Sequence, residues 1–137
     1  MKKVYGCSPF RVPDAVRARG PRAVLSQQRQ HHLWAVAIAR MAFEQGYLPV
    51  IPHIYLPQFV ADDLPTERSL ALQWGLEWLE GCDQVWALDV PPSEGMQGEL
   101  DRAAALGIPV VRIPINDLPP VSRSCWDMVN VLSTLRA

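Results

Sequence analysis

The chain has 137 residues, of which 49% are hydrophobic and 20% are charged, and its formal net charge is −1. This composition is typical of a globular domain, and the length suits one domain with a buried core. Its 13 basic and 14 acidic residues form no block of like charge, which disfavours a nucleic-acid binder that depends on phosphate attraction. We therefore expect a single domain over residues 1–137 with no nucleic-acid partner.

The cysteines and the apolar stretches bear on the compartment. Three cysteines without a short paired spacing predict neither a disulfide framework nor a zinc site. Residues 1–5 pass directly into a strand-like run without a signal-peptide core, and no apolar stretch approaches the ~20 residues of a membrane span. We expect a cytoplasmic protein that has no membrane partner.

Strand and helix patterns alternate from the start of the chain. An apolar run at residues 4–7 predicts the first strand, and the proline- and arginine-rich residues 11–25 predict a loop with at most a short helical turn. Ser26 is a typical N-cap, and apolar residues at helical spacing follow it to a C-terminal cap at Gly46. Residues 48–51 predict the second strand.

The middle of the chain continues the alternation. Residues 53–63, rich in aromatic residues and proline, predict a second long loop. Asp63 is predicted to cap a helix that has Pro65 in its first turn and runs to about Glu80. Residues 85–88 predict the third strand.

The last third repeats the pattern. Ser93 is predicted to cap a helix that ends at Gly107, and residues 108–113 predict a fourth strand. Residues 116–120 predict a turn, and residues 122–135 a final amphipathic helix.

This order predicts an α/β fold: a doubly wound, flavodoxin- or Rossmann-like parallel sheet of four to five strands with helices on both faces. Ligands of such sheets bind beyond the carboxyl ends of the strands, near the switch in strand order. Three segments are predicted to meet at that edge: residues 7–11, 52–55 and 89–99.

Residues 93–99 carry the strongest local signal. The glycines allow a ligand to approach the backbone closely, and a helix start offers free amide hydrogens to an anion. The Gly-Lys-Ser/Thr ending of a P-loop is absent, and no Gly-x-Gly-x-x-Gly follows the first strand, so we expect no dinucleotide and no other cofactor. Glu99 either points to the strand edge or pairs on the surface with Arg102, and the pattern leaves both open.

Residues 75–103 resemble the core of the nucleoside 2-deoxyribosyltransferase-like superfamily, and they are also similar to the deoxynucleoside 5'-monophosphate N-glycosidases. The shared features are an aspartate leading into a strand (Asp83), a Ser-x-Gly turn at Ser93 and a glutamate at Glu99. Residues 4–11 resemble the first-strand motif of these families, and the resemblance extends to about residue 111.

The resemblance implies an N-glycosidase or deoxyribosyltransferase that acts on a nucleoside or nucleotide. Glu99 would attack the anomeric carbon and displace the base, and water or a second base would resolve the glycosyl-enzyme intermediate. Tyr5 would border the sugar as a second catalytic residue, and Arg11 could pair with a 5'-phosphate. The predicted substrate-binding residues are Ser8, Arg11, His53, Asp89, Ser93, Gly95 and Met96. A homo-oligomer, dimeric or larger, is also implied.

One departure from the family pattern leaves a rival function open. In these enzymes an aspartate on the helix before the third strand often handles the leaving base, and Gly75 stands at that position. Glu77 or Asp89 could substitute for it. The rival is a non-catalytic nucleotide-binding or sensing module of the same fold.

Other side chains have plainer interpretations. His53 follows the second strand, where it is either a pocket residue or a structural histidine, whereas His31 and His32 are predicted to be exposed. Acidic side chains before and within the middle helix are predicted to cap or decorate it, with no metal site: Asp62, Asp63 and Glu67. Three tryptophans are predicted to be core or subunit contacts rather than base-stacking platforms: Trp74, Trp78 and Trp86.

The role of Cys7 and of the arginines in the first third of the chain is less specific. Cys7 lies beside the predicted pocket, and no basic partner marks the thiol as reactive. The basic residues of the first third could hold an anionic small molecule, or they could decorate a solvated loop: Arg11, Arg17, Arg19, Arg22 and Arg29.

Overall fold

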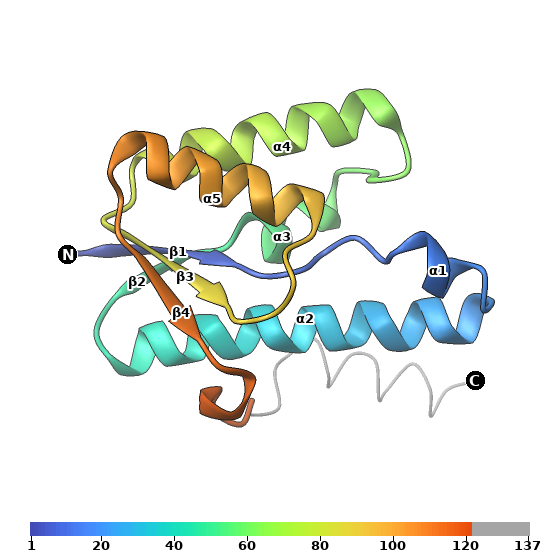
Figure 1. Ribbon diagram of the computed structural model, residues 1–137, viewed down its shortest axis with the longest axis horizontal. Coiled ribbons are helices and arrows are strands. Elements are labelled where there is room, and N and C mark those ends of the chain that lie inside the picture. Colours follow the sequence, from blue (N-terminus) through green and yellow to red (C-terminus); the bar gives the residue numbers. More distant parts are fainter. Residues whose placement is uncertain (122–137) are drawn as a thin grey trace.

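The computed structural model describes residues 1–121, which form a four-stranded parallel sheet with helices on both faces (Figure 1). The strands are β1 (Lys3–Cys7), β2 (Leu48–Val50), β3 (Gln84–Leu88) and β4 (Val110–Ile113), in the order β2-β1-β3-β4. This confirms the predicted fold class, and the strands agree with the predicted ranges within two residues. The predicted helix over residues 122–135 lies outside the described residues.

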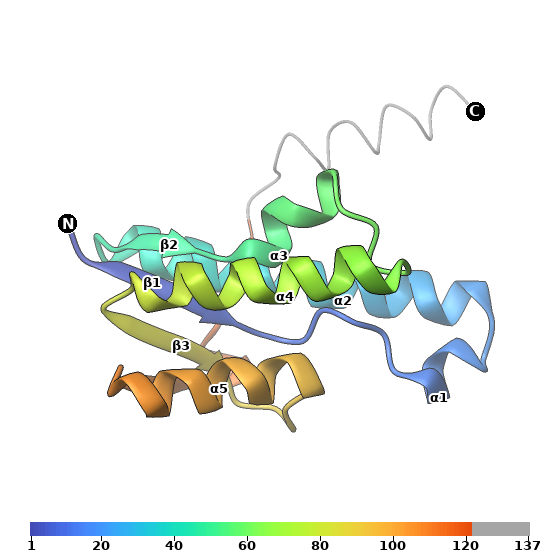
Figure 2. The same ribbon diagram turned by 90° about the horizontal axis from the view of Figure 1, so that it is seen from above.

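The helices divide between the two faces of the sheet. Helix α2 (Pro21–Glu44) covers one face, and α4 (Pro65–Glu80) and α5 (Glu94–Leu106) lie together on the other (Figures 1 and 2). The chain leaves β1 for β2 on one side and later returns to β3 on the other side of β1. The switch in strand order therefore falls between β1 and β3, where ligands of this topology bind.

Strands β1 and β3 send alternate side chains into two separate cores, as the period of two requires. Tyr5 and Cys7 pack with Val85 and Ala87 beneath α4 and α5. The intervening residues pack against α2: Val4, Trp86 and Leu88. Because both faces are covered, Tyr5 in the middle of β1 is buried.

The predicted start of the first long helix was wrong. Helix α2 begins at Pro21 with Gly20 as its N-cap, so Ser26 lies inside the helix. Proline suits the first helical position because its fixed φ is helical and its missing amide hydrogen would have no partner there. The short turn expected within residues 11–25 is α1 (Asp14–Arg17).

The segment after β2 also differs from the prediction. It is not a loop throughout, because α3 (Pro52–Tyr55) and the 3-10 turn η1 (Leu56–Gln58) occupy its first half. Asp63 does not cap α4: the N-cap is Leu64, since Pro65 takes the first helical position and leaves Asp63 one residue too early.

The ends of α5 follow the sequence signals. The Ser93 hydroxyl accepts a hydrogen bond from the Met96 amide at 3.3 Å, and Gly107 ends the helix with φ 69°. The 3-10 turn η2 (Ile115–Asp117) lies at the predicted turn after β4. Over residues 1–121, no helix combines the length and apolar character needed to cross a membrane.

Candidate active site

A cavity of about 730 Å³ opens at the carboxyl edge of the sheet. Segments that follow β1, β2 and β3 build it, together with one face of α4. Most of the predicted site residues line it: Tyr5, Ser8, Arg11, His53, Ser93, Gly95, Met96 and Glu99. Asp89 does not, because it is exposed and its amide donates to the Ile113 carbonyl at 2.8 Å, on the β4 side of the sheet.

Glu99 faces the protein interior and not the surface. Its Oε2 atom is buried and has no hydrogen-bond partner among residues 1–121. Arg102, the alternative surface partner, instead donates to Glu80 from Nε at 3.1 Å. The surface pair of Glu99 with Arg102 is therefore wrong, and a buried carboxyl oxygen lies at the cavity wall.

Burial dominates the electrostatics of Glu99. It raises the pKa of the carboxyl to about 7, although hydrogen bonding from the Tyr5 hydroxyl and the Cys7 thiol pulls the pKa back down in part. A carboxyl with this pKa is present in both charge forms at neutral pH. It can therefore serve as a nucleophile or exchange a proton there.

Tyr5 and Cys7 stay protonated beside Glu99. Burial, and then the adjacent Glu99 carboxylate, raise the pKa of Tyr5 well above its ordinary value, and the same two causes raise the pKa of Cys7. The Cys7 thiol contacts the Met96 carbonyl at 3.9 Å. Tyr5 is thus a neutral hydrogen-bond donor, and Cys7 lacks the thiolate that a reactive cysteine needs.

Gly75 leaves room for the Tyr5 side chain. A Cβ atom at Gly75 would lie 3.2 Å from the Tyr5 hydroxyl oxygen, closer than ordinary van der Waals contact. Neither Glu77 nor Asp89 lines the cavity, and both are exposed. The proposed substitution of either residue for the family aspartate is therefore wrong, and the Tyr5 hydroxyl lies next to the vacated position.

Ser8 and His53 form a hydrogen-bonded pair on the cavity wall. The Ser8 Oγ and His53 Nε2 atoms are 2.9 Å apart. Burial lowers the pKa of His53 to about 4, helped by the charges of His31 and His32. His53 is therefore neutral near pH 7 and offers one donor and one acceptor nitrogen.

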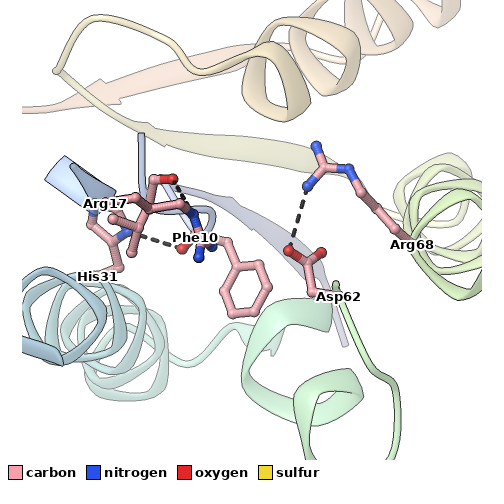
Figure 3. A network of polar contacts seen from close by, with 6 residues as sticks. Phe10, Arg17, His31, Asp62 and Arg68 are labelled. Carbon is pink, nitrogen blue, oxygen red and sulfur yellow. Dashed lines mark hydrogen bonds and ion pairs between the residues drawn. The ribbon is translucent and has the colours of Figure 1, made fainter. Parts of the chain in front are cut away.

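His31 is buried, contrary to the prediction. Its Nδ1 lies 3.0 Å from the Phe10 carbonyl oxygen, which can only accept, so Nδ1 carries the hydrogen (Figure 3). Nε2 then accepts from the Gln27 side-chain amide at 2.8 Å. The histidine satisfies a backbone carbonyl that the turn after β1 leaves without a sheet partner, and it fixes the cavity wall at Phe10 to α2.

The arginines of the first third do not act as one group. Arg11 alone among the five lines the cavity. Arg17 donates from Nε to the Val12 carbonyl at 3.3 Å (Figure 3), which ties α1 to the same wall.

Sequence analysis missed the contribution of α4. Its cavity-lining residues follow the i, i+3, i+4, i+7, i+8 spacing of one helix face: Arg68, Ala71, Leu72, Gly75 and Leu76. Arg68 pairs from Nη1 with Asp62 Oδ2 at 3.4 Å, and Asp62 also lines the cavity (Figure 3). The sequence signal for this cavity wall was a set of small and apolar residues at helical spacing, on the same helix face as one arginine.

The three tryptophans predicted to be core or subunit contacts do not line the cavity. Trp86 is buried against Tyr47, with ring centroids 5.4 Å apart. Trp74 and Trp78 are 40% and 38% exposed on α4 and do not line the cavity. Within residues 1–121, no three side chains of His, Cys, Asp or Glu gather where they could hold a metal ion.

The structure is a parallel sheet of the doubly wound α/β class, with a buried carboxyl group and a cavity at the switch point, where proteins of this class bind small molecules. The chain belongs to the family described as a domain of unknown function (DUF7768), whose family model matches residues 2–113. A search of curated proteins finds no match.

Among solved structures, the chain is similar to a 2-deoxyribosyltransferase from the psychrotolerant bacterium Bacillus psychrosaccharolyticus. The TM-score is 0.57 at 17% identity, over 88% of this chain and 77% of that one. At this identity the similarity shows a shared fold, and it supports a distant relationship at the level of the fold.

Proposed function

We propose that this protein is an N-glycosidase or deoxyribosyltransferase that acts on a nucleoside or nucleotide with Glu99 as its nucleophile. The observation that carries the proposal is the buried Glu99 Oε2 atom, which lies beside Tyr5 in the cavity wall and has no hydrogen-bond partner within residues 1–121. The shared fold with a 2-deoxyribosyltransferase supports the substrate class.

The reaction would proceed in two displacements. The Glu99 carboxylate attacks the anomeric carbon, the N-glycosidic bond breaks, and the base leaves with the bonding electron pair and takes up a proton. Water, or the nitrogen of a second base, then attacks the same carbon and releases Glu99. Tyr5 orients the carboxylate by donating a hydrogen bond, because its raised pKa keeps the phenol protonated.

The other cavity residues would bind the substrate. The Ser8–His53 pair offers a neutral donor and acceptor, and Ser93 with the adjacent Gly95 and Met96 brings the start of α5 to the ligand. Arg11, at the exposed rim, is the residue we assign to a 5'-phosphate when one is present.

We also propose a homo-oligomer. Four aromatic side chains of α3, η1 and α4 are 38–56% exposed: Tyr55, Phe59, Trp74 and Trp78. Tyr55 contacts both Phe59 and Trp78, with ring centroids 5.0 and 6.1 Å apart. Such an aromatic surface is typical of a protein interface.

The direct test is base release from a panel of 2'-deoxynucleosides and their 5'-monophosphates, followed by chromatography. The wild-type protein should release the base from at least one member, and the Glu99→Gln protein should release it about 10³-fold more slowly or not detectably. If the wild type releases no base from any of them, with or without an acceptor base, the enzymatic proposal fails.

The pH dependence of the reaction is a separate prediction. The nucleophile must be ionised, so kcat/KM should rise as the pH increases through about 7 and level off above it. Initial rates of base release between pH 5 and 9 measure this. If Glu99 instead acted as a general acid, the rate would fall over the same range.

A non-catalytic nucleotide-binding or sensing module is the second candidate function. Gly75 favours it, because no acidic side chain stands at that position to protonate a leaving base. Its signature would be a ligand that raises the melting temperature of the wild type without any base release.

A further inference from the structure

The ion pair of Asp62 and Arg68 has no role in the reaction proposed above, although both residues line the cavity. Asp62 comes from the connection before α4 and Arg68 from the first turns of that helix. Their side chains are only 33% and 21% exposed, and a single contact of 3.4 Å joins them. A half-buried guanidinium has five N–H donors, so one long contact among residues 1–121 leaves it with unused hydrogen-bonding capacity there.

The Asp62–Arg68 pair lies along α4 at some distance from the Glu99 end of the cavity. Arg68 and Gly75 are seven residues apart on one face of α4, which separates them by about 10 Å along the helix axis. Gly75 adjoins the Tyr5 hydroxyl, and therefore the Glu99 end of the cavity. A ligand whose reacting carbon lies at Glu99 would bring its far end toward Arg68.

The charges lining the cavity disfavour a phosphate at that far end. Two arginines, Arg11 and Arg68, face four carboxyl groups: Asp14, Asp62, Glu94 and Glu99. Asp62 already neutralises Arg68, so a phosphate there would meet a carboxylate at close range. A neutral group that both donates and accepts hydrogen bonds suits the pair better.

The cavity also has apolar walls that suit a flat ring. Several of the side chains that line it are apolar: Phe10, Leu56, Val60, Ala71 and Leu72. The Phe10 ring lies next to the His53 ring, with centroids 6.0 Å apart. A cavity with aromatic and aliphatic walls that also contains an arginine and a carboxylate, here Arg68 and Asp62, is a suitable environment for a nucleobase.

We propose that Asp62 and Arg68 form the base-recognition end of the cavity and select 6-oxopurines, that is, guanine and hypoxanthine. This inference rests on the proposed nucleoside site. The guanidinium donates to O6 and N7, the pairing that arginine makes with guanine elsewhere, and Asp62 accepts from the N1–H group. Adenine keeps N7 as an acceptor, but it presents an amino donor in place of O6 and an unprotonated N1, so it loses the second hydrogen bond from Arg68 and the N1–H bond to Asp62. A pyrimidine is shorter and reaches the pair less well.

The test measures binding separately from turnover. In the Glu99→Gln protein, calorimetry with deoxyinosine, deoxyguanosine and deoxyadenosine should show the two 6-oxopurine nucleosides binding at least about tenfold more tightly than deoxyadenosine. Adding Arg68→Met should reduce that ratio several-fold, to the part that Asp62 contributes through N1–H, and Arg68→Lys should give an intermediate ratio because lysine cannot bind in a bidentate manner. Arg40→Met, which removes the exposed Arg40–Glu44 pair on α2, is the matched control and should leave the ratio unchanged.

The possible failures are distinct. Equal affinities for all three nucleosides, no binding of any of them, or a preference that is undiminished in both Arg68 variants overturns the inference. A loss in Arg68→Met that affects deoxyinosine 5'-monophosphate but not deoxyinosine also overturns it, because Arg68 would then contact the phosphate. If the binding preference holds and the wild type releases no base, the base-recognition assignment stands and the enzymatic proposal fails.

Discussion

Replacing Glu99 with glutamine is expected to reduce base release by about 10³-fold or more, while the affinity for the nucleoside changes little. Removing the nucleophile of a covalent mechanism costs at least this much, because the remaining groups bind substrate but form no intermediate. Glutamine keeps the size of the side chain and can still accept a hydrogen bond from Tyr5. Single-turnover rates and calorimetric affinities for the same deoxynucleoside measure the two effects.

The matched control is Asp101→Asn. Asp101 lies on the same helix, is exposed, and accepts from the Gln97 side chain at 2.8 Å, away from the cavity. The same charge change at Asp101 should leave the rate near the wild-type value. A Glu99→Gln protein that retains wild-type turnover would exclude Glu99 as the nucleophile, however well the protein binds its ligand.

The same substitution should stabilise the fold at alkaline pH. The pKa of Glu99 is raised from 4.5 to about 7 by burial, so the folded protein holds a proton that the unfolded chain has released between these two pH values. The wild type therefore loses stability as the pH rises through this range. With ~1.4 kcal/mol per pKa unit, the loss is about 3 kcal/mol in the free energy of unfolding.

Glutamine does not ionise, so the stability of Glu99→Gln relative to wild type should grow by about 3 kcal/mol between pH 4 and pH 8. Urea unfolding at several pH values measures this difference, and Asp101→Asn should run parallel to the wild type. Parallel curves for Glu99→Gln and wild type would mean that Glu99 ionises as readily in the fold as in the unfolded chain. If Glu99→Gln is more stable than the wild type at alkaline pH, the buried carboxylate destabilises the fold. Such a result would agree with a catalytic role for Glu99.

Local signals in the sequence were sufficient for the sheet and for α5. Apolar runs fixed the four strands within two residues, and Ser93 and Gly107 act at the two ends of α5 as their residue types predict. Strand ranges and helix ends depend largely on residues close together in the sequence, so local residue types predict them. Tyr5, Ser8 and His53 are far apart in the sequence, but their meeting at the cavity follows from the predicted topology, since parallel strands place their carboxyl ends at one edge.

Helix starts were less predictable because two signals competed. Ser26 and Asp63 are good N-cap residues, but Pro21 and Pro65 set the helix starts instead. A proline at the first helical position loses no hydrogen bond, so its fixed φ prevailed over a cap a few residues away.

The state of each site residue depended on tertiary packing. The sequence determined that Glu99 stands on the helix after β3, at the switch point of a parallel sheet. Only the packing of α4 and α5 over Tyr5 and Cys7 decided that this carboxyl is buried, with Arg102 turned away to Glu80. The same packing made α4 a cavity wall with Gly75 beside the Tyr5 hydroxyl and with Arg68 two helical turns away. Burial and long-range pairing depend on residues far apart in the chain, and no local pattern records which face of a helix meets which strand.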